Sequence, residues 1–189
     1  PNSNSGLHPD EVTLADMLKD TGYRTACIGK WHLGHLPPCL PTYQGFDYYW
    51  GVPYSNDMWI DPANKLADDI RIRNGLTIGQ LQSGHRAKNQ VPIFRNDEVV
   101  EYPADQTTLT KRYTEKAIEF IEQNKEQPFF LYFPQAMPGS TRAPFASPAF
   151  KGASRNGPWG DSVEELDWST GQVLDKLVEL DIDKQTLVI

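Results

Sequence analysis

A lysine and a histidine two residues apart could together serve an anionic ligand. Lys30 can neutralise an anionic oxygen as a point charge, and His32 can donate a hydrogen bond or move a proton near neutral pH. In an extended loop the two side chains point the same way, so both could face one ligand. Gly29 precedes them and lets the backbone turn sharply and approach a ligand closely. On spacing alone, a solvated lysine beside a packed histidine is the favoured interpretation of the pattern.

The composition limits the classes of protein to which the chain can belong. It has 189 residues, of which 39% are hydrophobic and 23% charged, which suits one globular domain with its own core. No run approaches the roughly 20 apolar residues of a membrane span, so none is expected. A net charge of −7 argues against a nucleic-acid partner. The acidic excess lies beyond residue 95, which favours the first half of the chain for an anion site.

Three segments with apolar residues at helical spacing are each followed by a short apolar run typical of a strand. The predicted helices span residues 9–20, 107–124 and 161–180. The predicted strands span residues 24–28, 129–133 and 186–189. This alternation predicts an α/β fold with a mostly parallel or mixed central sheet flanked by helices. Because a domain that stops inside a buried strand has no natural boundary, we expect the domain to be truncated at both ends.

The pattern also predicts which faces are buried and where the loops lie. The continuous apolar run at 129–133 suits a strand buried on both faces. Residues 34–63 are predicted as a long ordered loop, and residues 93–101 as a hairpin with Asn96 and Asp97 at its turn. The apolar faces expected for the three helices are Leu14, Met17, Leu18 and Thr21; Tyr113, Ala117, Phe120 and Ile121; and Val163, Leu166, Thr170, Val173, Leu174 and Leu177.

Ligands of such sheets bind beyond the carboxyl ends of the strands. Two loops of this chain occupy that position, namely residues 29–57 after the first strand and residues 134–160 after the second. Lys30 and His32 lie at the start of the first loop. The sequence therefore predicts a site where these two loops meet.

Several sequence segments resemble the sulfatase family. GKWHLG at 29–34, preceded by GYRTACIG, is similar to the family's second signature. TLADMLKDTGYRT, LPTYQGFDYYWGVPYSND, PFFLYF and GDSVEELDWSTGQVLDKL are similar to further family segments in the same order. The resemblance is closest to the arylsulfatase A-like branch of the alkaline phosphatase-like superfamily, and only residues 60–105 lack a clear match. It implies that residues 1–189 are a partial catalytic domain, without the N-terminal nucleophile segment and the C-terminal metal-ligand segment.

This resemblance implies a sulfuric ester hydrolase that cleaves aryl or carbohydrate sulfates. Such enzymes use a formylglycine nucleophile and a calcium ion, both expected outside this chain, so the fragment alone should be inactive. By resemblance, Lys30 binds the sulfate oxygens, and His32 is the catalytic base that hydrogen-bonds the formylglycine hydrate. Ser55 matches a substrate-contacting serine, although it could instead cap the backbone of a local turn. The family also implies an extracytoplasmic location, whether secreted, periplasmic or lysosomal.

The chain departs from the family pattern at three places. The nucleophile motif Cys/Ser-x-Pro-x-Arg is absent; Cys39 begins a similar run but lacks the arginine and follows the lysine motif, so we reject it. No metal ligand can be named in this chain, because an isolated Asp57 or Asp61 does not make a calcium site. Gly139 stands where a histidine that protonates the leaving group is expected, and glycine cannot transfer a proton. The nearest cation, Arg142, is too basic to act as an acid.

Two alternative functions remain. Gly139 keeps open a non-catalytic pseudo-sulfatase that binds sulfated glycans. A related phosphoester hydrolase is also possible, but the GKWHLG segment disfavours it.

Other conspicuous residues have simpler interpretations. His35 and His85 are expected to be surface or loop histidines, His8 is expected to be structural, and the two cysteines are expected to be ordinary thiols. The aromatic cluster could stack on a substrate, but packing of the long loop is favoured for most of its members. Acidic residues near 165 could bind metal, but a solvated or paired role is favoured. The two cysteines are Cys27 and Cys39. The aromatic cluster consists of Phe46, Tyr48, Tyr49, Trp50, Tyr54 and Trp59, and the acidic residues are Glu164, Glu165 and Asp167.

Overall fold

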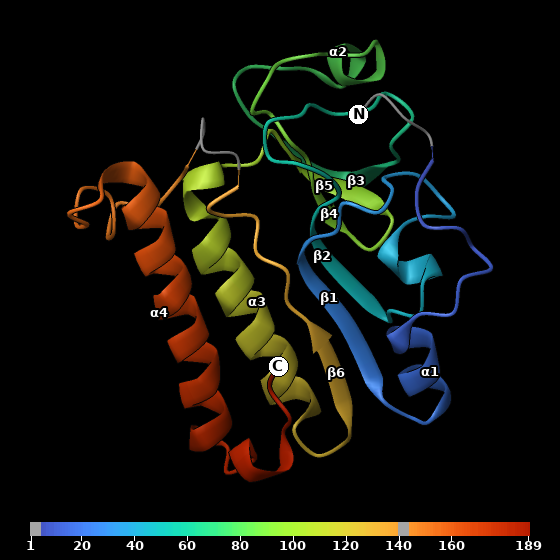
Figure 1. Ribbon diagram of the computed structural model, residues 1–189. Helices are drawn as coiled ribbons and strands as arrows, with labels where there is room; N and C mark the ends of the chain where they lie inside the picture. The colour runs from blue at the N-terminus through green and yellow to red at the C-terminus, as the bar shows by residue number, and fades with distance from the viewer. Residues whose placement is uncertain (1–4, 140–143) are drawn as a thin grey trace.

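Six strands form one mixed sheet in the computed structural model, which describes residues 5–139 and 144–189 (Figure 1). The strand order is β3-β5-β4-β2-β1-β6. The strands are β1 (Arg24–Lys30), β2 (Tyr48–Val52), β3 (Leu66–Ile72), β4 (Ile93–Arg95), β5 (Glu98–Tyr102) and β6 (Phe129–Tyr132). The helices are α1 (Leu14–Asp20), α2 (Ile78–Gln82), α3 (Leu109–Asn124) and α4 (Gly157–Glu179), with 3-10 turns at Pro41–Tyr43, Gln106–Thr108 and Asp183–Gln185. The expected α/β class with a mixed sheet is confirmed.

Strand β1 lies at the centre of a parallel group, with β2 on one side and β6 on the other. Its residues alternate between two cores, as a strand buried on both faces requires. Ala26 and Ile28 pack on the face covered by α3, whereas Cys27 packs with Ala15 of α1 on the opposite face. Figure 1 shows α3 and α4 on one side of the sheet and α1 on the other. Buried β1 thus holds its carboxyl end, with Lys30, at a fixed place.

Helix α3 confirms the apolar face predicted for it. Tyr113, Ala117, Phe120 and Ile121 are all buried. The helix begins at Leu109, two residues later than predicted, because Asp105 accepts a hydrogen bond from the Thr107 N–H and closes a 3-10 turn first. The predicted hairpin is also confirmed, since β4 and β5 pair antiparallel and Asn96 has a left-handed φ of 57° at the turn.

Helix α1 is shorter than predicted, and its expected apolar face is wrong. Thr13 caps the helix in a capping box with Asp16, so the chain becomes helical only at Leu14. Leu14 is 54% exposed and Met17 59%, while Ala15 is the buried residue of the helix. The small alanine lets the helix lie close to the sheet.

Helix α4 begins at Gly157, earlier than predicted, and it buries a polar face instead of the expected apolar one. Ser162, Glu165 and Ser169 are buried, and the Ser169 hydroxyl lies 2.6 Å from the hydroxyl of Thr114 on α3. Of the predicted face only Leu177 is fully buried, and Leu174 is 41% exposed. Small hydroxyl residues allow the two helices to approach and satisfy one another's hydrogen bonds, which the apolar pattern could not reveal.

Two strand predictions need correction. Residues 129–133 were expected to be buried on both faces, but β6 lies at the edge of the sheet and Tyr132 is 41% exposed. Residues 186–189 were expected to begin a strand, but they form no strand here, and Leu187 is 84% exposed. A strand needs a neighbouring strand to bond, and in the described structure none pairs with residues 186–189.

The predicted loop at residues 34–63 contains a strand, β2, and residues 64–92 contain β3 and α2. Pro and Gly on both sides of the short aromatic segment at 48–52 hid β2 from the pattern. The expectation for Arg142 lies outside the described residues. Among those that are described, no helix is long and apolar enough to cross a membrane.

Candidate active site

Three loops meet where the parallel strands β2, β1 and β6 end, as predicted for a ligand site in such a sheet. Backbone hydrogen bonds join them at the end of β1. The Lys30 N–H donates to the Pro134 carbonyl after β6 at 2.7 Å, and the His32 N–H donates to the Pro53 carbonyl after β2 at 3.0 Å. The loop of residues 31–40, the loop of residues 53–64 and the start of the loop after β6 therefore form one connected edge (Figure 1).

Glycine is required at the end of β1 for a reason different from the one expected. A Cβ on Gly29, whose φ is 137°, would stand 1.9 Å from the Pro134 carbonyl oxygen. A Cβ on Gly51, the β2 partner of Gly29, would stand 1.8 Å from the Gly29 carbonyl oxygen. The close approach is thus between neighbouring strands, and it packs the three loops tightly together.

Lys30 closes β1 with a half-buried side chain. In the part of the chain that the structure describes, its ammonium group forms no ion pair. A cation held at the end of a buried strand without a carboxylate partner is suited to an anionic ligand. The arrangement agrees with the sequence interpretation of Lys30.

His32 has an exposed side chain on a strained backbone. Its φ of 60° is left-handed, which is uncommon for a residue with a Cβ. Desolvation by the surrounding protein, and then the positive charge of Lys30, lower the pKa of His32 below 6.5, while the negative charge of Asp57 opposes this shift. The imidazole is therefore mainly neutral at pH 7 and able to accept a proton.

Ser55 and Asp57 flank a buried asparagine that fixes the loop after β2. The Asn56 amide donates to Gln106 Oε1 at 3.2 Å, and Gln106 Nε2 donates back to the Asn56 carbonyl at 2.7 Å. Ser55 is half-buried, and among residues 5–139 and 144–189 its hydroxyl forms no hydrogen bond, which disfavours the capping role considered for it. Sequence analysis missed Asn56 and Gln106, because a lone pair of amides 50 residues apart gives no signal.

Gly139 lies on the loop after β6 and faces the loop after β2. Its φ is 59°, and a Cβ there would stand 2.8 Å from Asn56 Oδ1 and 2.9 Å from the Ala136 carbonyl oxygen. The position is therefore built for glycine. A histidine side chain could occupy it only if Asn56 and the backbone moved.

His35 lies in a loop, as one of the two expectations for it had it, but it does not lie on the surface. It is 5% exposed, and its Nε2 atom lies 2.8 Å from Asp61 Oδ2. His85, by contrast, is half-buried and hydrogen-bonded to Gln90 Oε1 at 3.0 Å. His8 is exposed near Asp10. His35 thus joins the loop that follows β1 to the loop that follows β2.

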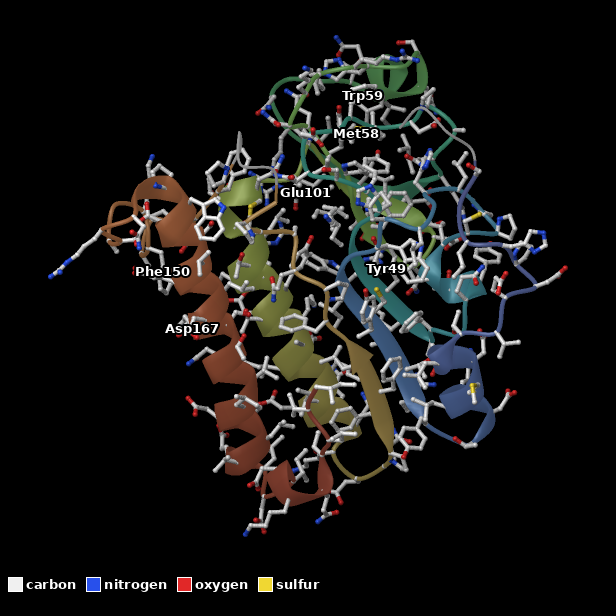
Figure 2. The ribbon with its side chains drawn as sticks, viewed as in Figure 1. Tyr49, Met58, Trp59, Glu101, Phe150 and Asp167 are labelled. Atoms are coloured by element: carbon white, nitrogen blue, oxygen red, sulfur yellow. The ribbon has the colours of Figure 1, made fainter. Side chains whose placement is uncertain are left out.

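The aromatic cluster mainly packs these loops, as favoured from the sequence. Phe46, Tyr49, Trp50 and Tyr54 are buried, whereas Tyr48 and Trp59 are half-buried. In Figure 2, Met58 and Trp59 lie above the ends of the strands, near α2, while Tyr49 lies within the sheet. The guanidinium of Arg86 lies 5.9 Å from the centre of the Trp59 ring, so this ring already has a partner.

Among the acidic residues near 165, Glu165 departs from the expected solvated or paired role, because it is buried and holds backbone. Glu165 accepts a hydrogen bond from the Ser147 N–H at 2.8 Å, and Asp161 accepts bonds from Gly152 and Ser154. Glu164 and Asp167 are exposed, and Figure 2 shows Asp167 on the outer side of α4. Within the described residues, no three His, Cys, Asp or Glu side chains gather as metal ligands would.

Neither cysteine suits the role of a nucleophile at this site. Both thiols are free, and Cys27 is buried inside β1, where burial raises its pKa. Cys39 is half-buried, and its carbonyl accepts a hydrogen bond from the Trp31 indole. These contacts agree with the interpretation of both residues as ordinary thiols.

Comparisons with known proteins agree on one family. The family model described as Sulfatase matches residues 1–189. The chain is 38% identical over 186 residues to arylsulfatase G of Mus musculus, covering 93% of this chain and 34% of that protein. It is 31% identical to steryl-sulfatase of Homo sapiens, covering 98% and 40%, and 34% identical to N-acetylgalactosamine-6-sulfatase of Mus musculus, covering 97% and 32%. The chain thus spans about a third of the length of these relatives.

Solved structures share the fold. The crystal structure of Ps i-CgsB in complex with k-i-k-neocarrahexaose superposes with a TM-score of 0.72 at 22% identity, covering 96% of this chain and 39% of that one. At that identity the likeness concerns the fold alone.

Proposed function

Because the chain belongs to the sulfatase family, we propose that the full-length protein hydrolyses sulfate esters, and that residues 1–189 supply one side of its active site. One observation supports this most. The loops that carry Lys30, His32 and Ser55 meet at the carboxyl ends of three parallel strands, with an unpaired cation among the described residues there. Relatives named as arylsulfatase G and N-acetylgalactosamine-6-sulfatase support an aryl or carbohydrate sulfate as the substrate.

Each of the three residues receives a role that its surroundings suit. The Lys30 ammonium binds the sulfate oxygens and stabilises the negative charge that grows on them in the transition state. His32, neutral at pH 7, accepts a proton from the attacking group. The Ser55 hydroxyl, which has no hydrogen-bond partner among the described residues, donates a hydrogen bond to the substrate. Partial desolvation at this edge strengthens each of these interactions.

The nucleophile and the metal ligands are proposed to lie outside residues 1–189. The described residues do not fit either group, because they gather no set of metal ligands and Cys27 is buried in a strand. When present in the complete protein, formylglycine would supply the attacking oxygen and calcium would offset the sulfate charge. The 189-residue piece alone is therefore proposed to be inactive, and the complete protein to act outside the cytoplasm.

Gly139 determines which leaving groups the proposed site would favour. Since glycine has no acid to offer, substrates whose leaving oxygen is stable without a proton are favoured, and aryl sulfates with acidic phenols are of this kind. The same residue supports a second candidate function, a pseudo-sulfatase that binds sulfated glycans without cleaving them. The cramped geometry at Gly139 is the observation that favours it.

Turnover by the full-length protein separates the two functions. An aryl sulfate with an acidic phenol should release its phenol, whereas the matching aryl phosphate should not. Binding of a sulfated oligosaccharide, with no hydrolysis of the aryl sulfate or the aryl phosphate, would support the pseudo-sulfatase. Preferential cleavage of the phosphate would contradict both.

A further inference from the structure

The buried pair of His35 and Asp61 connects the two loops that carry the proposed site residues. Its side chains are 6% and 15% exposed, and the contact of 2.8 Å joins residues 26 apart in the sequence. His35 lies three residues after His32, and Asp61 lies six residues after Ser55. Both loops leave neighbouring parallel strands, and the pair joins them beyond the strand ends.

Asp61 is itself held firmly in position. Its Oδ1 atom accepts a hydrogen bond from the Ala63 N–H at 2.8 Å, and its own N–H donates to Asn64 Oδ1 at 3.2 Å. The Asn64 amide then donates to the His35 carbonyl at 2.9 Å. The two loops are thus joined through the backbone as well as the side chain of His35, which gives this contact a defined geometry.

The charge of Asp61 makes its partner necessary. Burial would raise the pKa of Asp61, but hydrogen bonds from Ala63 and His35 outweigh this effect and lower it. Asp61 is therefore a carboxylate at neutral pH. A largely buried carboxylate without a partner is costly, and here it would also stand near a site proposed to bind an anion. His35 supplies the partner.

Neighbouring contacts transmit this arrangement to the proposed site residues. The ring of Tyr54, which directly precedes Ser55, meets the His35 ring edge-on at 5.3 Å, and its hydroxyl donates to the Trp59 carbonyl. On the other side, the left-handed backbone of His32 persists only where its surroundings over-determine it. The His32 bond to Pro53 and the His35 contact three residues later both constrain that segment.

We propose that His35 and Asp61 are positioning residues that hold the His32 loop against the Ser55 loop in the reactive arrangement. This inference rests on the proposed function, because it assigns the pair a purpose in sulfate-ester hydrolysis. The pair touches no substrate. It acts by fixing where the His32 imidazole and the Ser55 hydroxyl stand, and small misplacements of such groups reduce catalysis strongly.

The test compares variants of the full-length protein. His35→Leu should lower kcat by about tenfold or more and change KM by less than about threefold, since Lys30 stays anchored in β1. His35→Gln, which keeps a donor for Asp61, should restore kcat to within about threefold of the unmodified protein. The matched control is His85→Leu, which also removes a hydrogen-bonded histidine from a loop but not from between the site loops; its kcat should not change.

A second readout does not depend on catalysis. In protein labelled at histidine, the imidazole resonance of His32 should shift in His35→Leu, but not in His35→Gln or His85→Leu. If the unmodified protein fails to cleave sulfate esters while this shift is seen, the proposed function is wrong and the positioning stands. If His35→Leu unfolds, Asp61→Asn replaces it, and the same fall in kcat and shift of His32 are expected. The proposal would be overturned if the tested variant, His35→Leu or Asp61→Asn, had a lower melting temperature but an unchanged kcat per active site and an unchanged His32 resonance.

Discussion

Gly139 packs against Asn56 so closely that a Cβ would stand 2.8 Å from the Asn56 amide oxygen, on a backbone whose φ is 59°. Gly139→Ala in the full-length protein should therefore lower the free energy of unfolding by about 2 kcal/mol or more, from a left-handed backbone and a steric overlap together. Gly75→Ala is the matched control, because Gly75 has a φ of 68° but open space around it, and about 1 kcal/mol is expected there. Denaturant unfolding measures both. Equal losses would mean that the contact with Asn56 is unimportant.

The absence of an acid at Gly139 predicts a steep dependence of rate on the leaving group. Without protonation, the departing oxygen carries its full negative charge, so kcat/KM should fall strongly as the phenol pKa rises. A series of aryl sulfates that spans phenol acidity measures the slope in the full-length protein. A shallow slope would show that another residue supplies the proton.

Lys30→Ala is expected to lower kcat/KM at least about a hundredfold, which corresponds to roughly 3 kcal/mol of transition-state stabilisation. The reason is the position of its ammonium group at the end of β1 with no carboxylate partner in the described structure. Lys125→Ala is the control, because Lys125 follows α3 far along the chain and its side chain is 44% exposed. Activity of Lys30→Ala equal to that of the control would assign Lys30 to the ordinary surface.

The lowered pKa of His32 predicts how activity falls at acidic pH. The neutral imidazole is needed to accept a proton, so activity should fall as the pH drops through a pKa below 6.5. Asp57→Asn removes the negative charge that raises the pKa of His32, so the acid limb should move to lower pH. Lys30→Met removes the positive charge that lowers this pKa, so the His32 imidazole should titrate at higher pH.

Two measurements check these shifts. The pH profile of kcat is recorded for Asp57→Asn, and the His32 resonance is titrated for both variants. Movement of the two variants in the same direction would contradict the electrostatic origin of the shift.

Sequence analysis correctly predicted the elements whose residues follow one local pattern, such as apolar residues at helical spacing or a residue type suited to a turn. Helix α3 buries Tyr113, Ala117, Phe120 and Ile121 at helical spacing, and the hairpin has Asn96 at a turn that needs a left-handed residue. Helix α4 misled the same reasoning because its contact with α3 is made by Ser169 and Thr114. Strand β2 was hidden by the Pro and Gly residues around it, since its stability comes from pairing with β1 and not from its own pattern.

The candidate site residues were predicted where they stand in a recognisable segment. The resemblance to family segments identified Lys30 and His32 at the end of β1, and Ser55 after β2. The partners that fix the loops come from distant segments, as His35 does with Asp61 and Asn56 with Gln106. Such pairs arise from the order of strands in the sheet, which no local pattern of residue types contains.

Strand β6 carries a practical consequence for anyone who produces these 189 residues alone. Among the described residues it lies at the border of the sheet with only β1 beside it, so its outer row of N–H and C=O groups is a template for a strand from another molecule. The tail from Leu187 to Ile189 adds exposed apolar surface. Concentrated preparations should therefore self-associate through strand addition at this border, and a charged or proline substitution on the outer side of β6 should keep the molecules apart.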